Sequence, residues 1–150
     1  MRKLLKMLKK DERGLTLVEL LAVIVILAIV GAIAFVAIGN VIENSKQDAH
    51  IANAQQLISA AKLAEAGGLQ IDSTNGVKAT DIENIESLTD PWTKDPYSTV
   101  GTVYKDGDTY SVALNDNGNK CNLTKDKATE ANLNKHGRKL CDTKFDPSKD

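Results

Sequence analysis

The side chain with the most unusual setting for chemistry is Glu19, a single carboxylate near the start of a long apolar segment. Residues 20–38 carry no charge, and at about 1.5 Å per residue this stretch spans a hydrocarbon core of roughly 30 Å. An acidic side chain in hydrocarbon costs roughly 2.5–3.5 kcal/mol on insertion scales. An ordinary anchor gains nothing from that cost unless its acid points back to water. Glu19 therefore indicates a subunit that needs a buried partner for its carboxylate.

Charge is divided unevenly along the chain. Residues 1–14 carry six basic and two acidic side chains, whereas residues 15–150 carry 13 basic and 18 acidic ones. Positive charge beside an apolar span stays on the cytoplasmic side of a membrane, which predicts a cytoplasmic N-terminus and an external remainder. The apolar run is too long for an ordinary cleaved secretory signal, whose core has about 7–15 residues.

Two further groups of side chains could form a disulfide or bind a metal: a pair of cysteines and a set of three aspartates. Cys121 and Cys141 lie in the part predicted to be external, where a cysteine pair favours a disulfide, and without a neighbouring histidine they do not form a zinc pattern. Asp106, Asp108 and Asp116 offer the oxygen ligands that calcium prefers, and they are the calcium candidates of the chain. Turns carry such residues in any case, and the spacing of an EF-hand loop is missing.

Nothing in the sequence indicates an enzyme. We expect His50 on the polar side of a helix and His136 in a loop, and neither has a recognisable set of catalytic partners. The chain contains no glycine-rich phosphate loop and no nucleophile elbow. The sequence therefore predicts no catalytic residue and no cofactor.

Six basic side chains gather near the two cysteines: Lys120, Lys125, Lys127, Lys135, Arg138 and Lys139. Acidic residues are interspersed among them, which is typical of a solvated surface of mixed charge. The same cluster could contact DNA or another polyanion, since phosphate backbones are bound by lysine and arginine. Both interpretations stay open from the sequence alone.

The hydrophobic pattern predicts one helix from about Leu15 to Ala66, apolar all round in its first half and amphipathic in its second. Neither proline nor glycine interrupts residues 40–66, and Gly67 with Gly68 supplies a C-terminal stop. One face of the second half collects apolar side chains that must pack on another part of the chain: Ile51, Ala54, Leu57, Ile58, Ala61 and Ala64.

The remaining sequence predicts a small antiparallel sheet. Residues 67–97 read as a connector with a short helix at 80–88. Residues 98–105 and 109–114 are rich in Val, Thr and Tyr and flank Asp-Gly-Asp, which is a hairpin signal, and a third strand is expected near 120–124. After that the chain reads as polar and mostly irregular. The predicted fold class is α+β, with the long helix packed on the sheet.

The run around Glu19 resembles the class III leader of type IV pilins and pseudopilins. The matching residues are Gly14-Leu15-Thr16-Leu17-Val18-Glu19, although the family usually begins its mature chain with Phe or Met rather than Leu. The resemblance implies cleavage between Gly14 and Leu15 and N-methylation of Leu15. It also assigns Thr16 and Glu19 to filament assembly, where the acid pairs with the N-terminal amine of a neighbouring subunit.

This resemblance implies a type IV pilin-like fold and a division of the chain into four parts. Residues 1–14 would be a cleaved leader, 15–39 a transmembrane and filament-core helix, 40–66 an amphipathic half-helix, and 67–150 a globular domain. The implied partners are other copies of the chain, a prepilin peptidase, and the platform protein and ATPase of pilus assembly. The chain would cross the cytoplasmic membrane before assembly and lie on the cell surface afterwards.

A second, local resemblance points to another branch of the same superfamily. Residues 90–97, Asp-Pro-Trp-Thr-Lys-Asp-Pro-Tyr, are similar to the Asp-Pro-Trp-Gly-x-Pro-Tyr loop of major pseudopilins of type II secretion. The cysteine pair instead resembles the disulfide-closed loop of true pilins. The sequence thus leaves a major pilin, a secretion pseudopilin and a plain single-pass membrane protein as alternatives, in that order. It also leaves open whether a helix without a proline loosens in the filament.

Overall fold

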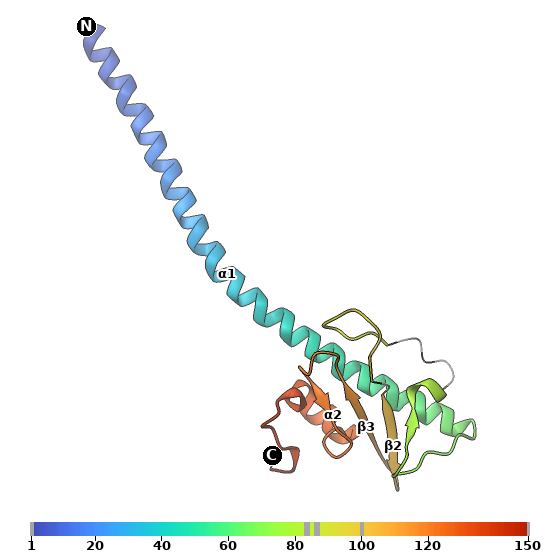
Figure 1. The fold of residues 1–150 in the computed structure, drawn as a ribbon. Helices are drawn as coiled ribbons and strands as arrows, with labels where there is room; N and C mark the ends of the chain where they lie inside the picture. Colours follow the sequence, from blue (N-terminus) through green and yellow to red (C-terminus); the bar gives the residue numbers. More distant parts are fainter. Residues whose placement is uncertain (1, 83–84, 86–87, 100, 150) are drawn as a thin grey trace. The chain divides into compact units, whose positions relative to one another are not determined.

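The computed structural model describes residues 2–82, 85, 88–99 and 101–149, with side chains from residue 16 onward. Its longest element is helix α1, Arg2–Ala66 (Figure 1). The chain divides into two compact units, Met1–Ile42 and Glu43–Asp150, and α1 begins in the first and ends in the second.

The first unit consists of α1 alone. The helix begins at Arg2 rather than near Leu15, so the expected start was wrong. The leader is rich in Leu, Lys, Met and Arg, which are good helix formers, and the single Gly14 disfavours a helix by only about 1 kcal/mol relative to Ala. Among the described residues, α1 is the one helix whose length and composition suffice to cross a membrane.

In the second unit, the end of α1 packs on a four-stranded antiparallel sheet. The sheet has the order β1 (Val77–Lys78), β2 (Thr102–Asp106), β3 (Thr109–Asn115) and β4 (Asn122–Leu123). The apolar face expected on the helix is confirmed, because five of its six residues are at most 5% exposed and the sixth, Ala64, packs against the core. These side chains share one core with Val103, Val112, Leu114 and Leu123 of the sheet. The architecture is therefore α+β, as predicted.

Helix α1 ends in a Schellman motif. Gly68 has a φ of +106°, its N–H donates to the carbonyl of Glu65, and the N–H of Leu69 donates to the carbonyl of Ala64. Glycine takes this left-handed backbone without the penalty of a Cβ. The predicted stop at this glycine pair is confirmed, and it turns the chain toward the sheet.

The predicted hairpin is β2 and β3. Asp106 pairs with Thr109, so a two-residue turn joins the strands, and Gly107 lies there at a φ of +58°. Strand β2 starts at Thr102 rather than at Ser98, because the Ser98 N–H donates to the side chain of Asn117 instead of a sheet partner. The third strand is likewise shorter than expected.

The segment after residue 124 was expected to be mostly irregular, and this expectation was wrong, because most of its described residues are helical. It contains α2, Glu130–His136, followed by the 3-10 helix η2, Gly137–Cys141, and further on by η3, Pro147–Lys149. The side chain of Thr129 caps α2 by accepting the N–H of Asn132. Two turns of helix are too short for a periodic signal to stand out in a polar sequence.

Within the described residues, the short helix expected at residues 80–88 is present only as a single turn. Ala79–Asp81 form the 3-10 helix η1, and Ile82 after it has extended backbone and is buried. Residues 83, 84, 86 and 87 of the expected helix lie outside the described residues.

Candidate functional site

The residues singled out at the leader lie within the continuous backbone of α1. Leu15 and Glu19 are four positions apart in this helix, on the same face and about 6 Å apart along the axis. The side chains of Thr16 and Glu19 are both exposed. Helical geometry thus places the Glu19 carboxylate on the same face of α1 as Leu15, one turn further along the helix.

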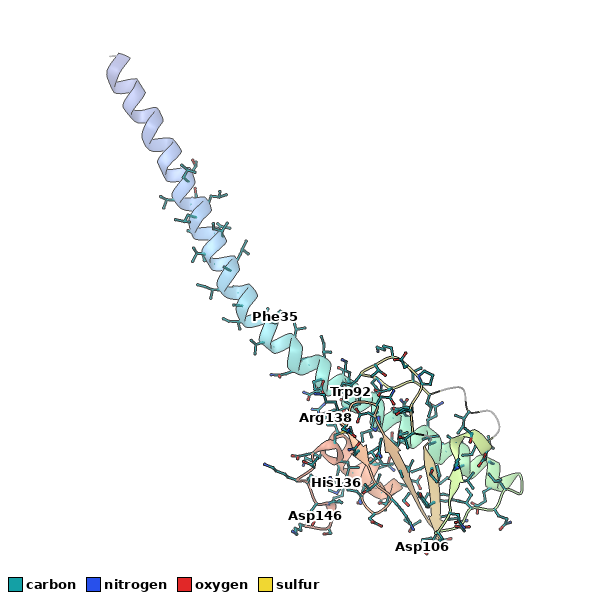
Figure 2. All side chains as sticks on the ribbon, viewed as in Figure 1. Phe35, Trp92, Asp106, His136, Arg138 and Asp146 are labelled. Atoms are coloured by element: carbon teal, nitrogen blue, oxygen red, sulfur yellow. A yellow bond between two sulfur atoms is a disulfide. The ribbon has the colours of Figure 1, made fainter. Side chains whose placement is uncertain are left out.

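Every Val, Leu, Ile and Phe from Leu17 to Ile42 is exposed, and their exposed fractions lie between 49% and 82%. Figure 2 shows these side chains radiating from α1, with Phe35 as the most exposed of them. A contiguous apolar surface of this extent exceeds what soluble monomers present and marks an interaction site for lipid or protein. Within this surface Glu19 is the single charged group.

Comparison with protein families matches residues 9–35 to the prokaryotic N-terminal methylation motif. The chain carries a class III leader of type IV pilin and prepilin-like proteins. This leader implies processing by a prepilin peptidase and assembly with pilus machinery, and with the long apolar helix it fits membrane anchoring before assembly. No curated protein and no solved structure matches the chain.

In the second unit, the most constrained polar group is His50. The prediction that His50 lies on the polar side of the helix was wrong, since the residue is fully buried. Its Nε2 is 3.2 Å from the Leu114 carbonyl, which can only accept, so Nε2 carries the proton. Its Nδ1 then accepts from the Tyr97 hydroxyl at 2.8 Å, and that hydroxyl accepts from Asn53 at 2.9 Å.

This chain of hydrogen bonds suits a neutral imidazole. Burial lowers the pKa of His50, against the opposing effect of the Leu114 carbonyl and of the nearby carboxylates of Asp116 and Asp90. Burial, together with the same two carboxylates, raises the pKa of Tyr97 to about 12, despite the hydrogen bond from Asn53. Both rings are therefore uncharged at neutral pH and hold α1 against the sheet through directional bonds.

The loop at residues 90–97 is built around a buried carboxylate. Asp90 is fully buried, and its two oxygens accept the N–H of Trp92 at 2.8 Å and the N–H of Asn117 at 2.6 Å. The Trp92 ring packs edge-on against His50, and its indole N–H donates to Glu43 of α1 at 2.9 Å. The structural role expected for this loop is thus present, and within the second unit the loop fastens the segment of α1 that begins at Glu43.

A second buried carboxylate organises the turn after β3. Asp116 accepts the N–H groups of Gly118, Lys120 and Cys121 at 2.8–3.0 Å. Burial alone would raise the pKa of Asp116, but the three backbone hydrogen bonds outweigh it and lower that pKa. The same bonds occupy backbone that the expected third strand would have used, which explains why β4 begins only at Asn122.

The structure contains the expected disulfide between Cys121 and Cys141, with an S–S distance of 2.03 Å. Both cysteines are buried in the core. The bridge joins the turn held by Asp116 to the end of η2, so it fixes the C-terminal segment to the sheet. His136, expected in a loop, is instead the last residue of α2, and its ring packs on Phe145.

The three calcium candidates do not converge. Asp106 and Asp108 lie at the β2–β3 turn, whereas Asp116 follows the other end of β3 and is saturated by backbone N–H groups. Among the described residues, no three His, Cys, Asp or Glu side chains gather as a metal site would require.

The basic cluster separates into two sets. Lys125 donates to the Ser73 carbonyl, Lys127 to the carbonyls of Leu140 and Asp142, and Arg138 to Asp48 at 2.9 Å. These three have structural partners within the chain. Arg138 is nevertheless exposed, as are the remaining members of the cluster, Lys120, Lys135 and Lys139. Contact with DNA stays a hypothesis.

Sequence reasoning missed Asn53, which ties α1 to the loop at Thr89 and Tyr97, and Asn117, which ties that loop to the turn after β3. The Asn117 side chain accepts from the Ser98 N–H at 2.6 Å and donates to Thr93 and to the Pro96 carbonyl. An Asp-Pro-Trp run signals an Asx turn, and that signal could have marked Asp90 as a loop centre. The bond between Asp90 and Asn117 joins residues 27 positions apart, and no local sequence pattern indicates it.

Proposed function

We propose that the chain is a structural subunit, a major pilin, of a bacterial type IV or competence-type pilus. The observation that carries this proposal is the methylation motif at residues 9–35, which leads directly into an exposed apolar helix. A filament core of packed helices would cover this surface. The chain brings no recognisable nucleotide site, so a separate ATPase would supply the energy of assembly.

In this proposal, cleavage after Gly14 creates the group that Glu19 needs. Before cleavage the nitrogen of Leu15 is part of a neutral amide, and afterwards it is a cationic amine. The amine of one subunit pairs with the Glu19 carboxylate of its neighbour, which neutralises two charges inside an apolar bundle and sets the register between subunits. Thr16 lies within the first turn after the cut and belongs to the same contact.

A pseudopilin of type II secretion is the second candidate, and the loop at residues 90–97 favours it. That loop is similar to a pseudopilin loop and is ordered here by Asp90 and Trp92. The Cys121–Cys141 disulfide favours the pilin branch instead. Because both candidates share the leader and the helix, only the assembled product separates them.

The deciding experiment is a mass spectrum of the N-terminal peptide from the chain purified from its own cells. The proposal expects a peptide that begins at Leu15 and carries one methyl group. The variant Gly14→Val should stay uncleaved, because a branched side chain replaces the glycine at the cleavage site. Normal processing of this variant, or an unmethylated intact leader in the wild type, would leave a plain single-pass membrane protein as the better description.

Electron microscopy of sheared surface material then distinguishes the two remaining candidates. Long surface filaments containing the chain support a pilus. Processed and methylated chain without surface filaments, in cells that lose secretion when the chain is deleted, supports a pseudopilin.

A further inference from the structure

Two adjoining depressions lie on the second unit, and the proposed function uses neither of them. The first has a volume of about 320 Å³ and lies beside the β2–β3 hairpin. The second has a volume of about 560 Å³ and lies between the segment before α2 and the η3 turn. Asp126 lines both, so they meet at this side chain and form one groove, which we call the Asp126 groove. Figure 2 labels an acid from each depression, Asp106 at the hairpin tip and Asp146 in the C-terminal segment.

The most informative side chain of the first depression is Ser111. Its neighbour in β3, Val112, shares the core with α1, and side chains alternate along a strand, so Ser111 points to the opposite face of the sheet. Ser111 is only 7% exposed and lines the depression, yet its hydroxyl has no hydrogen-bond partner among the described residues. A nearly buried polar group without a partner is rare, and this one is placed where a ligand can bond to it.

The other polar groups of the first depression include both acceptors and donors. The carboxylates of Asp106 and Asp126 are exposed, and neither has a hydrogen bond or ion pair within the part of the chain that the structure describes. Thr129 uses its side-chain oxygen to cap α2, which leaves its O–H available to donate. Lys125 donates to the Ser73 carbonyl and keeps further N–H groups for another acceptor.

The second depression adds an apolar surface. The half-buried ring of Phe145 packs on His136 with ring centroids 5.1 Å apart, and it lines the depression together with Pro147. The side-chain amide of Asn132, also in the lining, donates to a backbone carbonyl at 3.0 Å and keeps its oxygen as an acceptor. Flat apolar rings with a few polar groups beside them are typical of a site for a small organic ligand.

The Asp126 groove carries charges of both signs. Its charged lining consists of three carboxylates and two ammonium groups: Asp106, Asp126, Asp146, Lys125 and Lys127. A polyanion would meet the carboxylates and a polycation would meet the ammonium groups, and each contact would be repulsive. An uncharged polyhydroxylated ligand can use both, because each hydroxyl group donates one hydrogen bond and accepts others. The mixture therefore favours a saccharide, whose ring also presents an apolar C–H face.

We propose that the Asp126 groove binds an uncharged oligosaccharide, with sugar hydroxyl groups on Ser111 and Asp126 and one sugar ring against Phe145. Because the two depressions adjoin, the groove suits a chain of sugar units rather than a single one. This inference goes beyond the proposed function and does not depend on it, since the groove lies wholly within the second unit.

Sugar binding to the full-length chain, purified in a detergent without a sugar headgroup, tests the proposal. The probes are the unbranched tetrasaccharides of glucose, galactose, mannose and N-acetylglucosamine, titrated by saturation-transfer NMR. At least one should bind with a Kd of about 1 mM or tighter, a weak affinity that an open groove explains. The matching monosaccharide should bind about tenfold more weakly, because it fills only one depression. Added salt should leave the Kd unchanged, because the ligand carries no charge.

Two substitutions locate the ligand in the groove. Asp126→Ala removes the carboxylate common to both depressions and should weaken binding about tenfold or more. Ser111→Ala should weaken binding about fivefold and keep the melting curve, because its hydroxyl leaves no partner unsatisfied inside the chain. The matched control is Asp108→Ala, which removes an exposed carboxylate from the same hairpin but lines neither depression, and it should bind as wild type does.

Several outcomes would overturn the site. No binding by any of the four tetrasaccharides up to about 10 mM would do so, as would tighter, salt-sensitive binding of spermidine or an oligogalacturonate. Wild-type Kd in Ser111→Ala and Asp126→Ala would place the sugar elsewhere, and Ser111→Ala decides alone if Asp126→Ala does not fold. An equal loss in Asp108→Ala would assign the effect to general charge. Cleavage and methylation at Leu15 are measured separately, so failure of the proposed function leaves this test intact.

Discussion

The two units of the chain differ in where their side chains find partners. In the first unit, every large apolar side chain from Leu17 to Ile42 is exposed. In the second unit, the apolar face of α1 is buried, and His50, Asp90 and Asp116 are all buried with hydrogen-bond partners inside the chain. A single helix thus runs from a part that depends on other molecules into a part that is complete by itself.

This difference indicates that the two halves of α1 are constrained by different requirements. In the first half, almost any apolar residue satisfies lipid or a bundle of neighbouring helices, and only Glu19 is specific. In the second half, particular side chains pack against the sheet or form hydrogen bonds with the loops. Substitutions in the first unit should therefore affect assembly with little effect on folding, and substitutions at the buried positions of the second unit should do the reverse.

The largest effect is expected for Glu19→Gln, which removes the charge and keeps the size. Leaving the Leu15 amine of a neighbour unpaired in an apolar bundle should cost about 3–5 kcal/mol per contact, enough to abolish detectable filaments. Cleavage, methylation and the melting curve in detergent should match wild type. Quantified sheared filaments provide the measurement, and Glu19→Asp is the control that keeps the charge. Wild-type filament yield from Glu19→Gln would remove the ion pair from the mechanism.

The next effect is expected in the second unit, for Cys121→Ser combined with Cys141→Ser. Loss of a native disulfide from a small domain typically costs 2–5 kcal/mol, because the unfolded chain regains its freedom. Chemical denaturation of the detergent-solubilised chain should show this loss, with increased hydrogen exchange in α2 and η2 and little change in residues 16–42. Free thiols in the purified mature wild type would contradict the bridge itself.

These expectations show which parts of the molecule a sequence can predict. The apolar helix, its buried face, the hairpin and the glycine stop all follow from periodicity or turn chemistry, which are local signals. Helix α2 was missed because its seven residues are too few for a period, and His50 was misplaced for a different reason. His50 can be buried because Tyr97 and Leu114 satisfy its two ring nitrogens. These residues are 47 and 64 positions away along the chain, so no local sequence pattern indicates the two hydrogen bonds.

A smaller effect is expected from pH, through the hydrogen bonds of His50 that join α1 to Tyr97 and Leu114. Because the pKa of His50 is lower in the folded chain than in the unfolded one, the unfolded state binds more protons near and below the ordinary histidine value of about 6.5. Its contribution to stability is complete above that value and is lost as the pH falls toward the folded pKa. Melting temperatures between pH 7.5 and pH 5 should therefore fall more steeply in wild type than in His50→Gln.

Two residues serve as controls for this pH dependence. His136 is retained in His50→Gln, so the difference between the two profiles reports on His50 alone. Tyr97→Phe removes the hydroxyl that donates to Nδ1 and should lower stability by about 0.5–1.5 kcal/mol at pH 7.5, while the acid-dependent loss persists. Parallel profiles for wild type and His50→Gln would show that the buried imidazole does not couple folding to pH.

The smallest effect is expected for Glu130→Gln, at an ion pair on the surface of the second unit. The Lys62 ammonium lies 2.6 and 2.7 Å from the two Glu130 oxygens, but both side chains are 40% exposed, and exposed pairs contribute only about 0.2–1 kcal/mol. The melting temperature should drop slightly in low salt, and the difference should shrink as salt is added. A loss as large as that of the disulfide variant would mean that surface charge, rather than the buried core, stabilises this unit.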